Sequence, residues 1–320
     1  MKAIRYHQPG GPEVLRYEDV PEPVPGPGQV LIEVLAAGVN YSDVRRRLTD
    51  SLAVLPAIPG NEASGTVVAL GEGVSEFRVG DVVVYGNVAG ASAQRSVVPA
   101  AQLVKLPAGL DPKLAAAAFV QGLTAHTMGF GAYHLKNGET VLVHAGAGGV
   151  GGLLTQMAKQ AGSTVIATVG SDAKIEAARA AGAEVVINYN THDFEAEVKR
   201  ATGGKGVNAV FDSVGKTTFV KGLNCLGHLG TMVLFGQASG QAEPIDVALL
   251  HRGGQYITRT GMNHFITSRA DLLSRSYEVL SWAAGGRLRV PYTTYPFTEA
   301  VEAHRLMQDR RTTGKLLLLP

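Results

Sequence analysis

The part of this chain that most constrains its fold is the stretch from residue 139 to residue 170. An apolar run from Thr140 to Val143 leads into a glycine-rich turn, a helical run from Val150 to Ala161 and a second apolar run. A strand, a turn, a helix and a second strand, in that order, are typical of the repeating unit of a parallel α/β sheet. The sequence therefore predicts parallel strands covered by helices.

The turn carries three glycines, Gly146, Gly148 and Gly151, in the spacing G-x-G-x-x-G. The first allows a tight bend, the second lets the backbone approach a pyrophosphate, and the third lets the helix pack on its strand. Amide N–H groups and the positive end of the helix dipole then face the phosphate oxygens. The pattern predicts a dinucleotide site, with a plain tight turn as the alternative in a chain that has 40 Gly. The residues predicted to form this site are Gly146, Ala147, Gly148, Gly149, Val150 and Gly151.

The end of the second strand indicates which dinucleotide would bind. An NAD site usually has Asp or Glu there, to hold the ribose 2′-OH. The strand from Val165 to Val169 instead runs into Gly170 and Ser171, and Lys174 follows one turn into the next helix. Hydroxyl, amide and ammonium groups suit a 2′-phosphate, so NADPH is predicted over NADH. Two alternatives stay open: Ser171 simply caps the helix, or Asp172 lies close enough for NADH to be used.

Length and composition exclude several classes of protein. A chain of 320 residues predicts two domains, and a net charge of +2 with no long basic run does not predict a nucleic-acid partner. The single cysteine, Cys225, allows neither an intrachain disulfide nor a cysteine zinc cluster, which suits a reducing, cytoplasmic location. No signal peptide is predicted, because Met1 to His7 lacks a continuous apolar core. No membrane span is predicted either, because the uncharged stretch from Leu114 to Leu135 contains Gln121 and two histidines.

The pattern of predicted elements changes along the chain. Residues 1 to about 120 alternate short strands with Gly- and Pro-rich turns, which predicts a compact, barrel-like domain. Helix–strand alternation then continues to a last strand at Gln255 to Thr258, which predicts a parallel sheet with helices on both faces. Helices are predicted at Ser268 to Ala284 and at Phe297 to Asp309, and the final run of leucines is expected to be a buried strand that returns to the first domain.

With these elements in place, the chain resembles the medium-chain dehydrogenase/reductase superfamily, and within it the zinc-free quinone oxidoreductases related to ζ-crystallin. The resemblance covers essentially the whole chain. The segments that carry it are Met1 to Ile4, Gly38 to Asp43, Pro59 to Gly65, Gln121 to Ala125, Ala145 to Gly151, Ile187 to Tyr189, Phe211 to Gly215, Phe235 to Gln237 and Gly314-Lys315. It implies an α/β protein with a GroES-like β-barrel catalytic domain (residues 1–121 and 262–320), a Rossmann doubly wound parallel sheet domain that binds NADPH (residues 122–261), and an active site between them.

Two asparagines distinguish the chain from the zinc alcohol dehydrogenases of the same superfamily, which carry Cys where Asn40 stands and His where Asn61 stands. Amide groups are poor ligands for a borderline-soft cation, so no metal is predicted. Without a Lewis acid, hydride should pass from NADPH to an acceptor already polarised by conjugation, such as a quinone, an enone or an enal.

Four residues are candidates for the catalytic site. Asn40 would bind nicotinamide ribose or a substrate oxygen, or it simply forms a turn. Tyr41 would donate a proton, or it is a buried aromatic. Asp43 would orient its neighbours or cap the following helix, with capping favoured. Thr124 would contact nicotinamide, or it is a core threonine.

The resemblance also implies cofactor contacts. Those predicted beyond the glycine turn are Gly170, Ser171, Lys174, Tyr189, Ser213, Phe235, Gly236, Gln237 and Arg310, the last of which could equally be a surface charge. Arg45, Arg46 and Arg47 are predicted to form a solvated helix face, with steering of an anionic acceptor as the alternative.

The predicted function is therefore NADPH-dependent reduction of a quinone by a zinc-independent enzyme. An alkenal, enone or enoyl-thioester reductase of the same fold is the closest alternative. An NADPH-bound structural or RNA-binding protein like ζ-crystallin is the alternative from another class, disfavoured by the balanced charge. A homodimer is expected from the resemblance alone.

Overall fold

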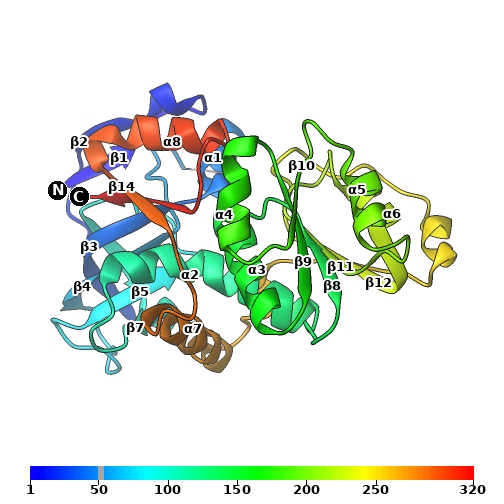
Figure 1. The fold of residues 1–320 in the computed structure, drawn as a ribbon. Helices are drawn as coiled ribbons and strands as arrows, with labels where there is room; N and C mark the ends of the chain where they lie inside the picture. The colour runs from blue at the N-terminus through cyan, green and yellow to red at the C-terminus, as the bar shows by residue number, and fades with distance from the viewer. Residues whose placement is uncertain (50–53) are drawn as a thin grey trace. The chain divides into compact units, whose positions relative to one another are not determined.

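The computed structural model describes residues 1–49 and 54–320. Its contacts divide the chain into two compact units (Figure 1). The first comprises Met1–Val120 and Ser268–Pro320, and the second comprises Gln121–Thr267. We refer to them as unit 1 and unit 2.

Unit 2 is built on a six-stranded sheet in the order β10-β9-β8-β11-β12-β13, in which every neighbouring pair is parallel. Numbered along the chain from β8, the order is 3-2-1-4-5-6, which is that of a doubly wound dinucleotide-binding sheet. The strands are β8 (Thr140–Val143), β9 (Thr164–Val169), β10 (Val185–Asn188), β11 (Val207–Asp212), β12 (Leu226–Leu234) and β13 (Tyr256–Arg259). The prediction of an α/β fold with a parallel sheet is confirmed.

Helices cover both faces of this sheet. Helices α3 (Gly149–Gln160) and α4 (Ile175–Ala180) lie on one side of it, and α5 (Phe194–Ala201) and α6 (Phe219–Cys225) lie on the other (Figure 1). The strands between them are almost continuously apolar and buried, as strands covered on both faces must be. The helix predicted after Ser171 opens with a 3₁₀ turn, Asp172–Lys174, and Ser171 makes no side-chain capping bond to it.

Unit 1 contains a seven-stranded, mainly antiparallel sheet with the path β14-β15-β3-β4-β5-β7, and β6 pairs with β3 beside that path. A hairpin of β1 (Lys2–Arg5) and β2 (Arg16–Asp19) accompanies it. The seven strands are β3 (Gln29–Val39), β4 (Glu62–Leu70), β5 (Val82–Gly86), β6 (Arg95–Pro99), β7 (Leu103–Lys105), β14 (Tyr292–Pro296) and β15 (Lys315–Leu319). The leucine tail is β15, which is buried and pairs antiparallel with β3, so that prediction is confirmed.

The remaining helices are α1 (Tyr41–Thr49), α2 (Pro112–Thr127), α7 (Arg269–Ala284) and α8 (Ala300–Gln308). Ser268 caps α7 by accepting a hydrogen bond from the Asp271 N–H, so the predicted start of that helix is confirmed. No helix in the described ranges is both long and apolar enough to cross a membrane.

The expectation of a solvated arginine face is wrong for Arg47. Arg45 and Arg46 are exposed, but Arg47 is fully buried. Its guanidinium donates to the Gly10 carbonyl oxygen at 2.7 Å and to Gln308 Oε1 at 2.8 Å. Helical spacing explains the difference, because residue 47 shares the inward face of α1 with the buried residues 43 and 44. Arg47 therefore attaches α1 to α8.

Candidate functional site

The glycine turn between β8 and α3 is tight enough to require its glycines. A Cβ added at Gly146 would lie 2.6 Å from the Cβ of Ala167 on β9, and one at Gly151 would overlap the Ala145 carbonyl oxygen. Ala145 itself has a φ of 55°, a left-handed conformation that is strained for a residue with a side chain. The turn is thus held close to β9 at its first glycine and close to its own backbone at its last.

The start of α3 is available for an anion. Its N-cap is Gly148, which has no side chain to bond the first amide N–H groups of the helix. β8 lies between β9 and β11, so the helix begins at the point where the strand order of the sheet reverses. Ligands of such sheets bind at this point, beyond the carboxyl ends of the strands. The backbone therefore fits the pyrophosphate of a dinucleotide.

The next two strand ends bring a second set of predicted residues together. A Cβ at Gly170, after β9, would lie 2.9 Å from the Tyr189 hydroxyl, after β10. Asn188 donates to Asp172 Oδ1 at 2.8 Å, so the acid that follows this strand end already has a partner. Lys174 ends the 3₁₀ turn that starts at Asp172. This arrangement agrees better with a 2′-phosphate than with a carboxylate-bound ribose.

The loops that follow β11 and β12 carry a third set of predicted cofactor residues. A Cβ at Gly236 would overlap the backbone of Ser213, so the two loops are in contact. Phe235 N–H donates to the Asp212 carbonyl oxygen at 2.9 Å, and Gln237 follows in the same loop. Because all these strands are parallel, these loops lie at the same edge of the sheet as the glycine turn.

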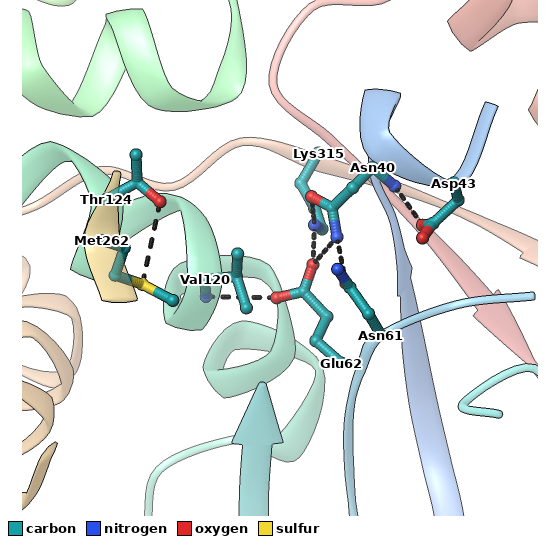
Figure 2. Close-up of polar contacts among 8 residues, drawn as sticks. All are labelled: Asn40, Asp43, Asn61, Glu62, Val120, Thr124, Met262 and Lys315. Carbon is teal, nitrogen blue, oxygen red and sulfur yellow. Dashed lines mark hydrogen bonds and ion pairs between the residues drawn. The ribbon is translucent and has the colours of Figure 1, made fainter. Parts of the chain in front are cut away.

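Unit 1 contains a buried polar network around Asn40, which follows β3 (Figure 2). Asn40 Nδ2 donates to Asn61 Oδ1 at 3.0 Å and to Glu62 Oε1 at 2.6 Å, while Lys315 Nζ donates to Asn40 Oδ1 at 2.8 Å. Lys315 also forms an ion pair with Glu62, and both side chains are 0% exposed. Glu62 Oε2 accepts from the Val120 N–H at 3.1 Å, so both oxygens of this carboxylate have a partner.

Sequence reasoning did not identify Glu62 or Lys315 as members of this group. One signal was present: each is a charged residue at the beginning of a strand whose other residues carry no charge. Charged residues are almost never fully buried unless they are paired, so two such positions of opposite sign suggest a contact. Only the pairing of β15 and β4 with β3 brings them together.

The other predicted catalytic residues are placed as follows. Tyr41 is half-buried and packs against the core of unit 1. Asp43 Oδ2 accepts from the Asn40 N–H at 2.8 Å, as a residue capping the start of α1 does. Thr124 lies in unit 2, where its hydroxyl is 3.8 Å from Met262 Sδ (Figure 2). Arg310 is exposed after α8, in a left-handed conformation with a φ of 56°. Their catalytic and cofactor roles stay predictions.

Burial raises the pKa of Asp43 from 3.8 to about 7, although its bond from Asn40 and the charge of Lys315 act in the opposite direction. The folded protein therefore binds a proton more tightly at Asp43 than the unfolded chain does. Between about pH 4 and pH 7 the stability should fall as pH rises, by about 1.4 kcal/mol per pH unit, and then level off.

We expect Asp43→Asn, which keeps an acceptor for the Asn40 N–H, to remove this pH dependence. The wild type should lose about 2–3 kcal/mol more than the variant between about pH 5 and pH 8. Urea unfolding followed by the fluorescence of Trp282, the single tryptophan, measures this because Trp282 lies on α7 in unit 1. Equal pH profiles for the two proteins would contradict the raised pKa.

Asn40 and Asn61, which stand where the zinc alcohol dehydrogenases carry Cys and His, do not suit a metal ion. The side chains of Asn40 and Asn61 bond each other, and the Lys315 ammonium lies 2.8 Å from the Asn40 oxygen that a cation would need. Glu62 already forms an ion pair with that ammonium. Within residues 1–49 and 54–320, no group of three or more His, Cys, Asp or Glu is placed to hold a metal.

Comparisons with known proteins agree with this architecture. Residues 26–108 match the alcohol dehydrogenase GroES-like domain, and residues 149–277 match the zinc-binding dehydrogenase domain. The GroES-like expectation for the first domain is confirmed. The second description includes zinc, whereas the donor groups of this chain do not fit that ion.

Full-length relatives are also found. The chain is 38% identical to quinone oxidoreductase 1 of Escherichia coli, with 99% of each chain covered. It is 38% identical to a 2-haloacrylate reductase of a Burkholderia species, with 98% of this chain and 97% of the relative covered. The crystal structure of Escherichia coli quinone oxidoreductase complexed with NADPH matches with a TM-score of 0.96 at 37% identity, over 100% of both chains.

Proposed function

Because the chain belongs to the quinone oxidoreductase family of the medium-chain dehydrogenase/reductase superfamily, we propose that it is an NADPH-dependent quinone oxidoreductase that works without a metal. The observation that carries this proposal is the full-length similarity to a quinone oxidoreductase complexed with NADPH. The uncapped start of α3 at the switch point of the sheet supports the same cofactor.

NADPH, when bound, supplies a hydride. The groups proposed to hold its phosphates are the amide N–H groups at the start of α3, and Lys174 and Tyr189 are proposed to bind the 2′-phosphate. Ser213 and the loop Phe235 to Gln237 are proposed to contact the sugar and nicotinamide portions. A conjugated acceptor delocalises its developing negative charge, so the protein mainly has to position it.

A second candidate is reduction of a conjugated carbonyl compound. The relative named 2-haloacrylate reductase, which is as similar in sequence as the quinone oxidoreductase, favours it. A quinone and a 2-haloacrylate both contain a carbon–carbon double bond conjugated to a carbonyl group. One site could therefore deliver hydride to either.

Stopped-flow oxidation of NADPH, followed by its absorbance, tests both candidates. The panel should contain 1,4-naphthoquinone, 9,10-phenanthrenequinone, an enal and 2-chloroacrylate. We expect kcat/KM to be highest for the quinones. Higher values for 2-chloroacrylate or the enal would favour the second candidate, and binding of NADPH without reduction of any acceptor would exclude both.

Lys174→Ala should reduce the preference for NADPH over NADH by about ten- to a hundredfold, since one charge-assisted bond to a phosphate contributes about 1.5–3 kcal/mol. The loss should appear in the Kd for NADPH, with the Kd for NADH nearly unchanged. Fluorescence titration with both nucleotides measures it. Lys159→Ala is the matched control, because Lys159 lies at the other end of α3 and pairs with Glu184. An unchanged preference in Lys174→Ala would remove this residue from the phosphate site.

We further propose a cytoplasmic homodimer. Among the strands that the structure describes, β13 pairs with β12 alone, and Tyr256 on it is 58% exposed, which suits pairing with a second copy. The single cysteine, Cys225, is buried and its thiol pKa is raised to about 12 by burial, which suits a reducing compartment. Light scattering coupled to size exclusion measures the oligomeric state.

A further inference from the structure

One glycine of the cofactor turn lies against a buried glutamine. Gly149 is the first residue of α3, and a Cβ added to it would overlap the side-chain amide of Gln121. The oxygen, carbon and nitrogen of that amide are the three atoms nearest to the added Cβ. Gln121 lies on α2 and is the first residue of unit 2, so both residues belong to one unit. The amide of Gln121 therefore rests on the backbone at the start of α3.

This contact explains why position 149 is a glycine. Gly149 is not one of the three glycines of the G-x-G-x-x-G spacing, and it is not among the glycines with a left-handed φ. Its backbone conformation is therefore open to other residues, and alanine would favour the helix. What excludes a side chain at this position is the Gln121 amide.

The Gln121 amide is buried and incompletely bonded. The residue is 7% exposed, and its Oε1 has no hydrogen-bond partner in the described part of the chain. Unpaired polar atoms are rare in protein interiors, and each one needs a physical explanation. A glycine inside a helix and a buried amide without a partner both cost stability, and no bond within the protein offsets that cost here. Local costs of this kind are typical of a ligand site.

The place of the amide indicates what it binds. The first N–H groups of α3 have no side-chain cap, because the N-cap residue is Gly148, and such groups bind phosphate. Gln121 brings a further N–H donor and an acceptor oxygen to the same helix start. A dinucleotide offers both matching groups, because pyrophosphate oxygens accept hydrogen bonds and the adjoining ribose hydroxyls also donate them. A half-turn of the amide exchanges its two ends, so either assignment of oxygen and nitrogen allows this pairing.

We propose that Gln121 is a cofactor-binding residue whose amide donates a hydrogen bond to the pyrophosphate of NADPH at the start of α3. The inference rests on the proposed function and adds a side chain from α2 to a phosphate site that the glycine turn forms from its backbone. Gly149 then leaves the space in which this amide lies. The amide transfers no group, because it only binds the phosphate oxygen.

Gln121→Ala tests the proposal by titration calorimetry with two nucleotides. We expect the Kd for NADPH to rise by about tenfold or more, since a hydrogen bond to a charged group contributes at least that much. The Kd for adenosine 2′-monophosphate, which contains no pyrophosphate, should stay within about twofold of the wild type. A variant that merely folds poorly would bind both nucleotides less tightly.

Gln121→Glu tests the charge at the same position. At about pH 8 its carboxylate would repel the pyrophosphate, and we expect the Kd for NADPH to rise by about a hundredfold. Binding should recover as pH falls, because a protonated carboxyl group donates a hydrogen bond. Gln160→Glu is the matched control, because Gln160 is exposed at the opposite end of α3, and it should bind NADPH as the wild type does.

Gly149→Ala tests the contact between the two residues. In the wild-type background the added methyl group should displace the amide and raise the Kd for NADPH by about tenfold. In the Gln121→Ala background the same substitution should change this Kd by less than about twofold, because the amide is already absent. Equal effects of Gly149→Ala in the two backgrounds would overturn the proposed role of the contact.

The remaining outcomes separate the proposal from the proposed function. If the wild type binds NADPH and Gln121→Ala binds it equally well, a buried water completes the amide and the proposal is overturned. If Gln121→Ala weakens the binding of both nucleotides by the same factor, the residue supports the fold alone, and the proposal is again overturned. If the wild type itself does not bind NADPH, the proposed function is refuted.

Discussion

Lys315→Met should lower the free energy of unfolding of unit 1 by about 3–5 kcal/mol, the largest effect on stability that we expect from a single substitution in this chain. Removal of the ammonium leaves the Glu62 carboxylate fully buried without a cation, and Asn40 Oδ1 loses its donor. The desolvation cost of the carboxylate is then no longer compensated. Urea unfolding followed by Trp282 fluorescence reports on this unit.

Two further variants distinguish the effect of losing the buried ion pair from the effect of losing any lysine side chain. Lys2→Met removes an exposed ion pair with Asp19 in the same unit and should cost less than about 1 kcal/mol. The double variant Glu62→Gln with Lys315→Met removes both charges and should recover at least half of the loss. If Lys315→Met costs no more than Lys2→Met, the buried ion pair does not stabilise the fold as described.

Gly151→Ala should weaken NADPH binding by about a hundredfold or more. An added Cβ would overlap the Ala145 carbonyl oxygen, so the turn has to move away from the start of α3. Loss of two charge-assisted bonds to the pyrophosphate, at about 1.5–3 kcal/mol each, accounts for an effect of this size. Titration calorimetry with NADPH measures the affinity.

The neighbouring glycine provides the control. A Cβ at Gly152 would meet only the Gly146 carbonyl oxygen, at 3.4 Å, so Gly152→Ala leaves the turn intact. Both substitutions replace glycine by alanine in the first turns of α3, where alanine is favoured by about 1 kcal/mol. Gly152→Ala should therefore bind NADPH as the wild type does and unfold at a slightly higher temperature. Equal NADPH affinities for the two variants would mean that the turn does not bind the pyrophosphate.

Local patterns were sufficient to predict the parallel sheet, the glycine turn and the start of α7, because each depends on neighbours in sequence. The spacing of Gly146 and Gly151 predicts a close approach, and the structure shows which atoms require it, Ala167 Cβ and the Ala145 oxygen. Arg47 shows where local patterns fail. A run of three arginines suggests exposure to solvent. The helical periodicity of α1 instead places Arg47 on the inward face of the helix, where it donates to Gln308.

The sequence by itself determined the fold type of each unit and the glycine turn where a phosphate could approach the backbone. It also determined that Asn40 and Asn61 carry amide side chains, which do not suit zinc. Tertiary structure alone decided that Lys315 meets Glu62, residues separated by most of the chain and joined through β3. The Asn40 amide bonds both members of that ion pair. The physical reason is that a hydrogen bond depends on distance and direction in space, whereas a sequence pattern specifies only what lies within a few residues along one strand or helix.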